Sequence, residues 1–380
     1  MTEKIVADGK QRNSSIDLQR ILAFFFVVCL HSILNIGFTA CINRGKTMLV
    51  LNILYVLFYS CVGLFIMMTG FLQTKKTVSV KYYTGVIRTL VLYVMCSAVC
   101  MTYKVIEYDY PLTFKEWSTR ILGFTASDYA WYMEMYLGLF LMIPFLNAAY
   151  HGMKTHKRKL VLICSMLFIT ALPGVLNTFN LTTPGWWSDP ASSTSYTKLI
   201  PGWWTGMYPL TYYFIGCYLK EFPLRIKKRY LTLMLAFFVL AAGIYNYYRM
   251  HGTKFFYGSF MTNASIFITA IGVMVFSLTV SFDLTRIPIL LKRAMSHMAK
   301  WTFGAYLVSA AVDIYAYSKL KAAVPEVFDR IIYLPVTVIF VFTVSLAVSG
   351  VLNGIYDGVR LLGEHLWHKF RSKKDQSKSV

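Results

Sequence analysis

An arginine and a histidine occupy the first apolar segment of the chain, "IDLQRILAFFFVVCLHS", which runs from Ile16 to Ser32. A charged or titratable side chain at the centre of a bilayer costs at least ~2.5 kcal/mol on insertion scales. A neutral imidazole can accept a proton near pH 7, and a guanidinium pairs well with phosphate or carboxylate. Arg20 and His31 therefore predict a site that binds an anionic group and transfers a proton.

The spacing of these two residues puts them on one face of a helix. Eleven residues at about 100° each bring Arg20 and His31 within ~20° of one another, with a separation of ~16 Å along the axis. Asp17 and Asn35 fall within about 40° of the same line. We expect a polar stripe, with His31 at or beyond the middle of the membrane.

A histidine that acts as a base usually has an acidic partner that orients it. Glu134 and Asp313 are the candidate acids, because both fall in apolar segments at a depth that matches His31. Either acid could instead pair with a basic residue of an outer loop. Structural interpretations also exist for the other two residues: Arg20 could extend to lipid phosphates, and His31 could bond to a neighbouring helix.

The composition indicates an all-α, polytopic membrane protein. Hydrophobic residues make up 57% of the 380 positions and charged residues only 14%. A helix needs about 20 apolar residues to cross the hydrocarbon core, so there is room for about ten spans but for no separate soluble domain. The expected spans are residues 16–37, 49–72, 85–103, 129–149, 159–176, 206–219, 230–249, 261–281, 301–318 and 331–355.

The formal charge of +21 is explained by topology rather than by nucleic-acid binding. The 38 basic residues concentrate in alternate loops, and one set of loops holds more than twice as many as the other. Because cytoplasmic loops carry the excess of Lys and Arg, both termini are expected in the cytoplasm. Residues 1–15 and the basic residues 356–380 are then cytoplasmic tails that flank a membrane domain of residues 16–355.

Two outer loops, residues 104–128 and 177–205, are longer than chain reversal requires. The second loop contains "PGWW" twice, at Pro184–Trp187 and at Pro201–Trp204. These aromatic residues fit either an interfacial belt or a platform over an outer substrate. The seven cysteines form no CxxC pair and no histidine cluster has metal-site spacing, so no metal is expected.

Six stretches carry a series of motifs in a fixed order. After "IDLQRILAFFFVVCLHS" come "VGLFIMMTGFLQTKK" (62–76), "SVKYYTGVIRTLVLYV" (79–94), "YAWYMEMYLGLFLMIPFL" (129–146), "YYFIGCYLK" (212–220) and "MAKWTFGAYLVS" (298–309). The series resembles the acyltransferase-3 family of membrane acyltransferases. Three positions depart from the family pattern: Thr69 replaces a Ser, Gly85 replaces the first of two paired Arg residues, and Ser309 replaces a His.

The resemblance implies transfer of an acyl group, commonly acetyl, from cytoplasmic acyl-CoA to a hydroxyl of a cell-surface or lipid-linked glycan. Because Ser309 stands in the place of the second histidine, His31 is left to handle the proton. His31 acts either as a general base or as a covalent acyl carrier, with Glu134 or Asp313 beside it.

Substrate contacts are expected from five residues, and acyl-CoA is a substrate rather than a bound cofactor. Arg20 and Arg88 enter their spans from the same side and suit the phosphates or the pantetheine carbonyl of CoA. The other expected contacts are Asp17, Trp131 and Tyr132. The family's commonest setting implies the plasma membrane of a bacterium, with membrane lipids as further partners; the sequence does not indicate an oligomeric state.

Two other classes of protein remain open from the residues alone. Buried His, Arg and acidic residues in ten spans also describe a secondary transporter or a polyprenyl-glycan exporter. Such a carrier would show paired broken helices in corresponding halves, and the sequence shows no repeat of that kind. A sensor built on the same scaffold would work without His31.

Overall fold

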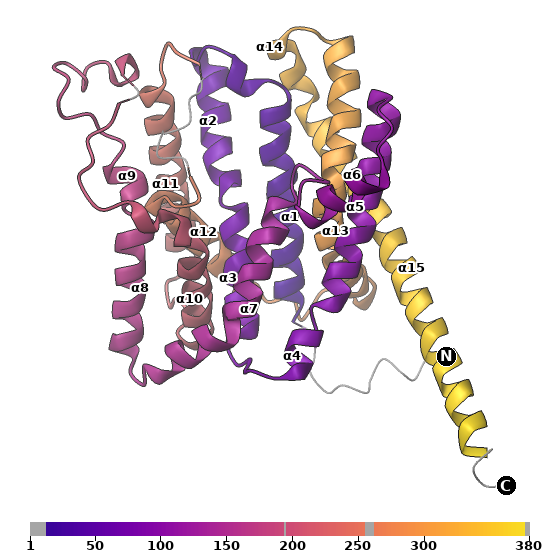
Figure 1. Cartoon of the computed structure of the whole chain (residues 1–380). Coiled ribbons are helices and arrows are strands. Elements are labelled where there is room, and N and C mark those ends of the chain that lie inside the picture. The colour runs from indigo at the N-terminus through magenta and orange to yellow at the C-terminus, as the bar shows by residue number, and fades with distance from the viewer. Residues whose placement is uncertain (1–12, 194, 255–261, 377–380) are drawn as a thin grey trace. The chain divides into compact units, whose positions relative to one another are not determined.

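The computed structural model describes residues 13–193, 195–254 and 262–376, and over these residues the fold is all-helical (Figure 1). The one β-type contact there is an isolated antiparallel bridge between Ile42 and Lys254. The all-α prediction is therefore confirmed. Most of the expected N-terminal tail and the last four residues of the C-terminal tail lie outside the described residues.

The chain forms two compact units. The first comprises Met1–Leu30, Thr39–Lys75 and Ala149–Lys300, and the second comprises His31–Phe38, Lys76–Ala148 and Trp301–Val380. Helices α1 (Ser14–Asn35), α7 (Trp131–Gly152) and α13 (Ile289–Ala323) contribute residues to both.

Six larger helices pack together in the first unit: α3 against α10, α11 against α2 and α12, and α8 against α10. A break at Ser60 separates α2 from α3, so the single span expected over 49–72 is two consecutive helices. The Ser60 hydroxyl donates to the carbonyl of Leu57, 2.7 Å away, a local bond that competes with regular helix geometry. The elements of this unit are η1 (Phe38–Ala40, shared with the second unit), α2 (Gly45–Tyr59), α3 (Cys61–Gln73), α8 (His156–Thr170), α9 (Pro173–Leu176), η2 (Pro190–Ser192), η3 (Trp203–Met207), α10 (Tyr208–Glu221), α11 (Lys228–Arg249) and α12 (Ile266–Val280).

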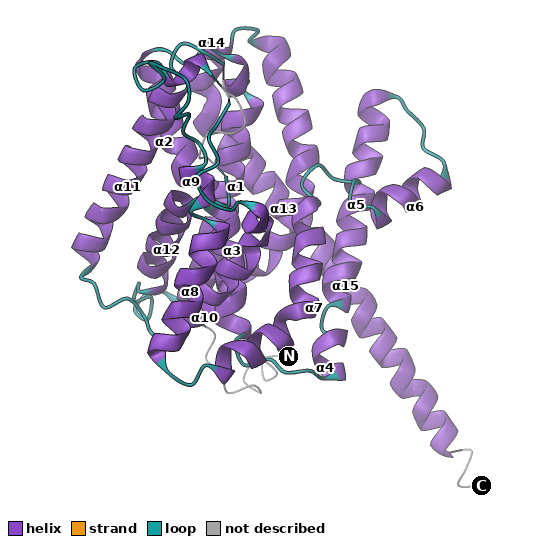
Figure 2. Cartoon of the chain, turned by 60° about the vertical axis from the view of Figure 1, so that its left-hand side comes forward, coloured by secondary structure: helices purple, strands orange, loops and turns teal. Residues whose placement is uncertain are grey.

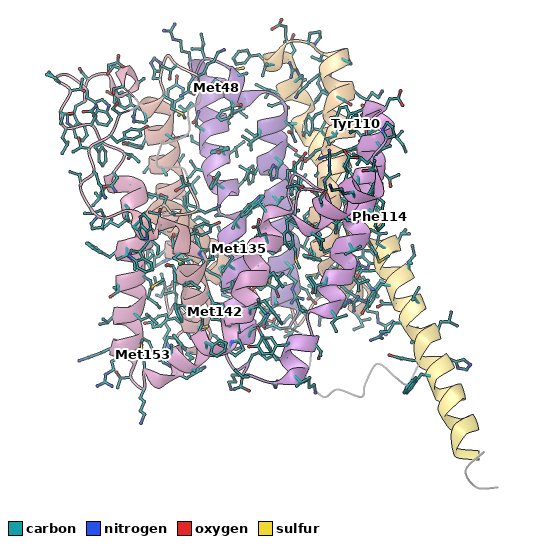
Figure 3. All side chains as sticks on the ribbon, in the orientation of Figure 1. Met48, Tyr110, Phe114, Met135, Met142 and Met153 are labelled. Atoms are coloured by element: carbon teal, nitrogen blue, oxygen red, sulfur yellow. The ribbon has the colours of Figure 1, made fainter. Side chains whose placement is uncertain are left out.

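In the second unit α5 packs against α6 and α15. Helix α6 lies in the loop expected over 104–128 and projects beside α5 (Figure 2). Its first residue, Phe114, is 88% exposed, and Tyr110 in the preceding turn also projects outward (Figure 3). The elements of this unit are α4 (Val80–Thr84), α5 (Ile87–Tyr108), α6 (Phe114–Leu122), α14 (Val327–Arg330), η4 (Ile331–Tyr333) and α15 (Leu334–Gln376).

Seven of the helical segments in the described chain are long and apolar enough to cross a membrane. Three other expected spans correspond to α10 with 14 residues, α12 with 15 residues, and the C-terminal part of the 35-residue α13. The count of ten spans and the cytoplasmic termini stay predictions. Helix α15 continues without a break past residue 355, where the sequence predicted the end of the membrane domain. The seven segments are Ser14–Ala40, Gly45–Gln73, Val80–Tyr108, Trp131–Gly152, His156–Leu176, Lys228–Arg249 and Val327–His365.

Two glycines allow α3 and α10 to approach backbone to backbone. A Cβ atom on Gly70 would lie 2.1 Å from the carbonyl oxygen of Tyr213, and one on Gly216 would lie 2.0 Å from that of Met67. Small residues permit such close contact between membrane helices, where van der Waals packing replaces the hydrophobic drive. Because the clashing atoms are backbone, a side chain at either position would have to separate the helices.

We predict that Gly216→Ala destabilises the protein by about 1–3 kcal/mol, the usual cost of overpacking a core. The measurement is the midpoint of thermal unfolding in detergent. Gly138→Ala on α7 is the matched control, because no atom lies within 4 Å of the added Cβ. Equal midpoints for the two variants would contradict the close approach of α3 and α10.

Candidate active site

His31 lies in the last turn and a half of α1, and a buried arginine fixes the end of that helix. The Arg330 guanidinium is 7% exposed, and its Nη1 donates to the carbonyl oxygen of Ile36 at 2.6 Å. Gly37, which follows, has φ of +101°, a conformation that ends the helix and favours glycine. The backbone around His31 is therefore held by α14.

The imidazole ring of His31 stacks on the ring of Tyr129. The ring centroids are 3.9 Å apart and the planes differ by 26°. Within the described part of the chain, the His31 side chain has no hydrogen bond and no ion pair, and the residue is partly exposed. The stacking fixes the plane of the ring, and both ring nitrogens remain available to another molecule.

Tyr129 connects this histidine to Asp313. Its hydroxyl donates to Oδ2 of Asp313 at 2.6 Å, and both residues are buried. The hydroxyl of Tyr306 in turn donates to the carbonyl oxygen of Tyr129, also at 2.6 Å. Two residues of α13 thus hold one tyrosine by its side chain and its backbone, and that tyrosine supports His31.

The loop that carries Tyr129 is itself bound to α13. Ser127 is buried and donates from its hydroxyl to the carbonyl oxygen of Leu307, 3.0 Å away. The second carboxylate oxygen of Asp313, Oδ1, is buried and lacks a hydrogen-bond partner among the described residues. A buried acceptor left open in this way costs stability, so it is a candidate contact for a substrate hydroxyl or a water.

The other expected residues of this region lie on α7 and have different surroundings. Glu134 is exposed, and no hydrogen bond or ion pair joins it to His31 in the described chain. Trp131 is 40% exposed, whereas Tyr132 is buried with its ring against that of Tyr306, 5.6 Å between centroids. Of the two candidate acids, the geometry therefore connects Asp313 and not Glu134 to the histidine.

Arg20 forms an ion pair within its own helix. Its Nη1 lies 3.7 Å from Oδ1 of Asp17, three residues earlier on α1. The Asp17 side chain is 4% exposed, whereas that of Arg20 is 31% exposed. The buried acid thus anchors a guanidinium that still reaches the surface, which suits the binding of an anion.

Arg88, the other expected acyl-CoA contact, is occupied by α15. It donates to Oδ1 of Asn353 at 3.0 Å, lies 3.4 Å from a carboxylate oxygen of Asp357, and stacks over the Tyr356 ring at 5.2 Å. These three contacts join α5 to α15. They support a structural role alongside any contact with substrate.

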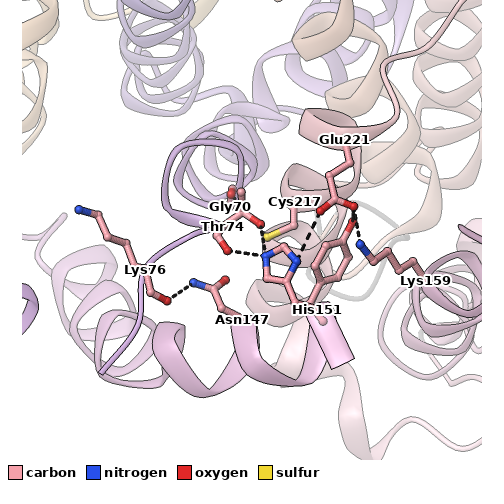
Figure 4. A network of polar contacts seen from close by, with 9 residues as sticks. Gly70, Thr74, Lys76, Asn147, His151, Lys159, Cys217 and Glu221 are labelled. Carbon is pink, nitrogen blue, oxygen red and sulfur yellow. Dashed lines mark hydrogen bonds and ion pairs between the residues drawn. The ribbon is translucent and has the colours of Figure 1, made fainter. Parts of the chain in front are cut away.

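A polar network in the first unit connects α3, α8, α10 and the end of α7 (Figure 4). His151 contacts the carbonyl oxygen of Thr74 through Nε2 at 2.7 Å and lies 3.5 Å from Glu221 through Nδ1. Glu221 also accepts from the buried Lys159 at 2.5 Å. Because the opposite charges of Lys159 and Glu221 pair with one another, we assign the network to the joining of α8 and α10.

Sequence reasoning missed Tyr129 and Arg330 as parts of the site. Tyr129 stands among several aromatic residues, and no local pattern marks it as the stacking partner. Arg330 counts as an ordinary loop charge when topology is predicted. Tyr129 begins the motif "YAWYMEMYLGLFLMIPFL" and Tyr306 lies in "MAKWTFGAYLVS", so a place in the motif series was the available signal for both.

The arrangement can remove a proton from a hydroxyl and position the hydroxyl oxygen for nucleophilic attack. It offers an uncommitted imidazole, a fixed aromatic support and a carboxylate with a free oxygen. Over the described residues no group of three or more His, Cys, Asp or Glu side chains could hold a metal ion. An imidazole and a carboxylate oxygen can supply acid–base or nucleophilic chemistry.

Comparison with known proteins identifies the family. A family model described as an acyltransferase domain, that of the acyltransferase-3 family, matches residues 13–352. No curated protein and no solved structure matches the chain. Because the family model covers most of the sequence, including α1, α7 and α13, the chain belongs to the acyltransferase-3 family of membrane acyltransferases.

Proposed function

We propose that this protein is an O-acyltransferase that moves an acyl group, preferentially acetyl, from cytoplasmic acyl-CoA to a hydroxyl of a cell-surface or lipid-linked polysaccharide. The setting that we propose is the plasma membrane of a bacterium. The observation that carries the proposal is the His31 imidazole, which is stacked on Tyr129 with both nitrogens uncommitted, in a chain of an acyltransferase family. A membrane histidine kept for structure alone would be expected to make a hydrogen bond.

The proposed reaction proceeds by one of two routes. In the direct route, His31 takes the proton of the acceptor hydroxyl while the hydroxyl oxygen attacks the thioester carbonyl. The carbon–sulfur bond then breaks, and CoA leaves as a thiolate that recovers the proton. In the relay route, an imidazole nitrogen attacks the thioester carbonyl first, the carbon–sulfur bond breaks, and CoA leaves as a thiol with the N–H proton of the ring. The acyl-imidazole then transfers its acyl group to the acceptor hydroxyl, whose proton returns to the freed ring nitrogen. Both routes need a free ring nitrogen.

Arg20 supports the donor side of the proposal. CoA carries several phosphate charges, and a partly exposed guanidinium binds phosphate with two parallel hydrogen bonds. The excess of basic residues in alternate loops favours a cytoplasmic position for the N-terminal end of α1. Arg20 would then face the compartment that contains acyl-CoA.

We predict that His31→Ala lowers acyl transfer by about 10²–10⁴-fold, the usual contribution of a positioned general base. The measurement is transfer of radiolabelled acetyl from acetyl-CoA into glycan by membranes with matched protein levels. His365→Ala, which changes an exposed histidine of α15, is the control and should retain full transfer. Equal labelling by wild type and His31→Ala would refute the role of His31, and no labelling by wild type would refute acetyl-CoA as the donor.

Tyr129 variants separate stacking from hydrogen bonding. Tyr129→Leu removes the ring under His31, and stacking energies of ~0.5–1.5 kcal/mol predict a loss of roughly 2–12-fold in turnover per folded molecule. Tyr129→Phe keeps the ring but leaves Asp313 without its donor, so we expect a lower unfolding temperature with a smaller loss of turnover. Turnover that falls equally in both variants would show that the ring does not position His31.

Arg20→Ala should raise the KM for acetyl-CoA by ~10-fold or more, with little change in kcat. The reason is loss of a charge-assisted bond worth about 1.5–3 kcal/mol. Arg286→Ala removes an exposed arginine of another loop and serves as the control for net charge. A drop in kcat at an unchanged KM would assign Arg20 to another role.

A further inference from the structure

The loop of residues 177–205 is fixed by a fully buried arginine. Arg249, at the end of α11, donates from Nη1 to the carbonyl oxygen of Pro190 and from Nη2 to that of Ser193, 3.2 Å away. Its guanidinium also lies over two aromatic rings of the loop, 4.9 Å from Trp186 and 5.2 Å from Tyr196. This combination of hydrogen bonds and cation–π contacts holds the middle of the loop against α11.

The preceding residue of α11 holds the adjacent part of the loop. The hydroxyl of Tyr248 lies 3.3 Å from the carbonyl oxygen of Trp187 and 3.4 Å from that of Ser188. Asn177 binds the other end, because its Oδ1 accepts from the backbone of Leu199 at 2.9 Å and of Ile200 at 3.0 Å. The loop is thus a preorganised surface rather than an open connection.

The two tryptophans of the first "PGWW" have different environments. Trp186 is 1% exposed and belongs to the interior, whereas Trp187 is 61% exposed. The Trp187 ring stacks on Phe179 with centroids 5.3 Å apart and planes 26° from parallel. The Trp187 ring is therefore supported by Phe179 and also contacts Trp186, with centroids 5.0 Å apart, while more than half of its surface stays exposed.

Exposed polar residues flank Trp187 in the sequence. The carboxylate of Asp189 is exposed two residues later, and it has no hydrogen bond or ion pair within the described residues. Thr182, Thr183 and Ser188 are also exposed. The hydroxyls of Thr182 and Ser188 are bonded within the loop, but the Asp189 carboxylate would be costly in hydrocarbon. This part of the loop is therefore better suited to an aqueous ligand than to lipid tails.

We propose that Trp187 and Asp189 form a subsite for a neutral sugar ring of the acceptor glycan. The C–H face of a pyranose packs on an aromatic ring, and a carboxylate accepts two sugar hydroxyls. The fixed loop reduces the entropy cost of forming both contacts. This inference rests on the proposed function, because it takes the acceptor to be a polysaccharide. Of the two roles that the sequence left open, an interfacial belt or a platform over a substrate, it gives the first "PGWW" the second.

The test is calorimetric titration of the full chain in nanodiscs with maltotetraose, cellotetraose and N-acetylated chitotetraose. We expect saturable binding of at least one, and Trp187→Ala should weaken it by ~10-fold, as for an aromatic residue central to an interface. Asp189→Asn should weaken it less. Trp203→Ala removes a tryptophan that is 89% exposed in the second "PGWW" and is the matched control.

The subsite would be overturned if no tetrasaccharide bound, or if Trp203→Ala and Trp187→Ala lost the same binding affinity. It would also be overturned if brominated lipid quenched a tryptophan fluorescence signal that disappears in Trp187→Phe. The last result would place the ring in the bilayer. Acyl transfer measured in the same preparations separates the two proposals. Binding without transfer by wild type would refute the acyltransferase activity and leave the subsite intact. Transfer with an unchanged acceptor KM in Trp187→Ala would refute the subsite alone.

Discussion

A titratable side chain in a membrane segment must be supported by other protein groups, because lipid offers it no hydrogen bonds. The second unit meets this constraint for His31 through ring stacking and not through a bond to nitrogen. Tyr129 supplies the stacked ring, and Asp313 fixes the tyrosine through its hydroxyl. The imidazole nitrogens are therefore left without a hydrogen bond to any described residue, and the folded protein bears that free-energy cost. Such a cost is expected where a group must remain available for chemistry.

Helical periodicity and hydropathy predicted part of this site. Both depend on local sequence, and they correctly indicated an all-helical fold, while the depth of Asp313 made it a candidate partner of His31. Depth along a helix does not determine which way a side chain faces, and so Glu134 was ranked ahead of Asp313 although it is exposed. Tyr129 was missed because the contact depends on how the loop before α7 packs against α13, and no pattern within either segment encodes that packing.

The same distinction applies to the helices. Seven of the ten expected spans correspond to helical segments that are long and apolar enough to cross a membrane, because length and composition are local properties. The break at Ser60 falls within an apolar run, where the hydroxyl bonds to the carbonyl of Leu57, and hydropathy does not detect it. The close contact at Gly70 and Gly216 depends on a neighbouring backbone. Glycine alone in a membrane helix does not reveal which helix it meets.

Two arginines that topology counts as loop charges are instead buried and bound to backbone carbonyls. Arg330 holds the end of α1 near His31, and Arg249 holds the loop that carries Trp187. A guanidinium can satisfy several carbonyl oxygens from one position, and removing it would leave those buried acceptors unpaired. Loops are usually mobile because their backbone groups face solvent. In these two segments, by contrast, the arginine side chains bind part of the backbone. Each unit therefore uses a buried charge to give an irregular segment the fixed geometry that a binding surface needs.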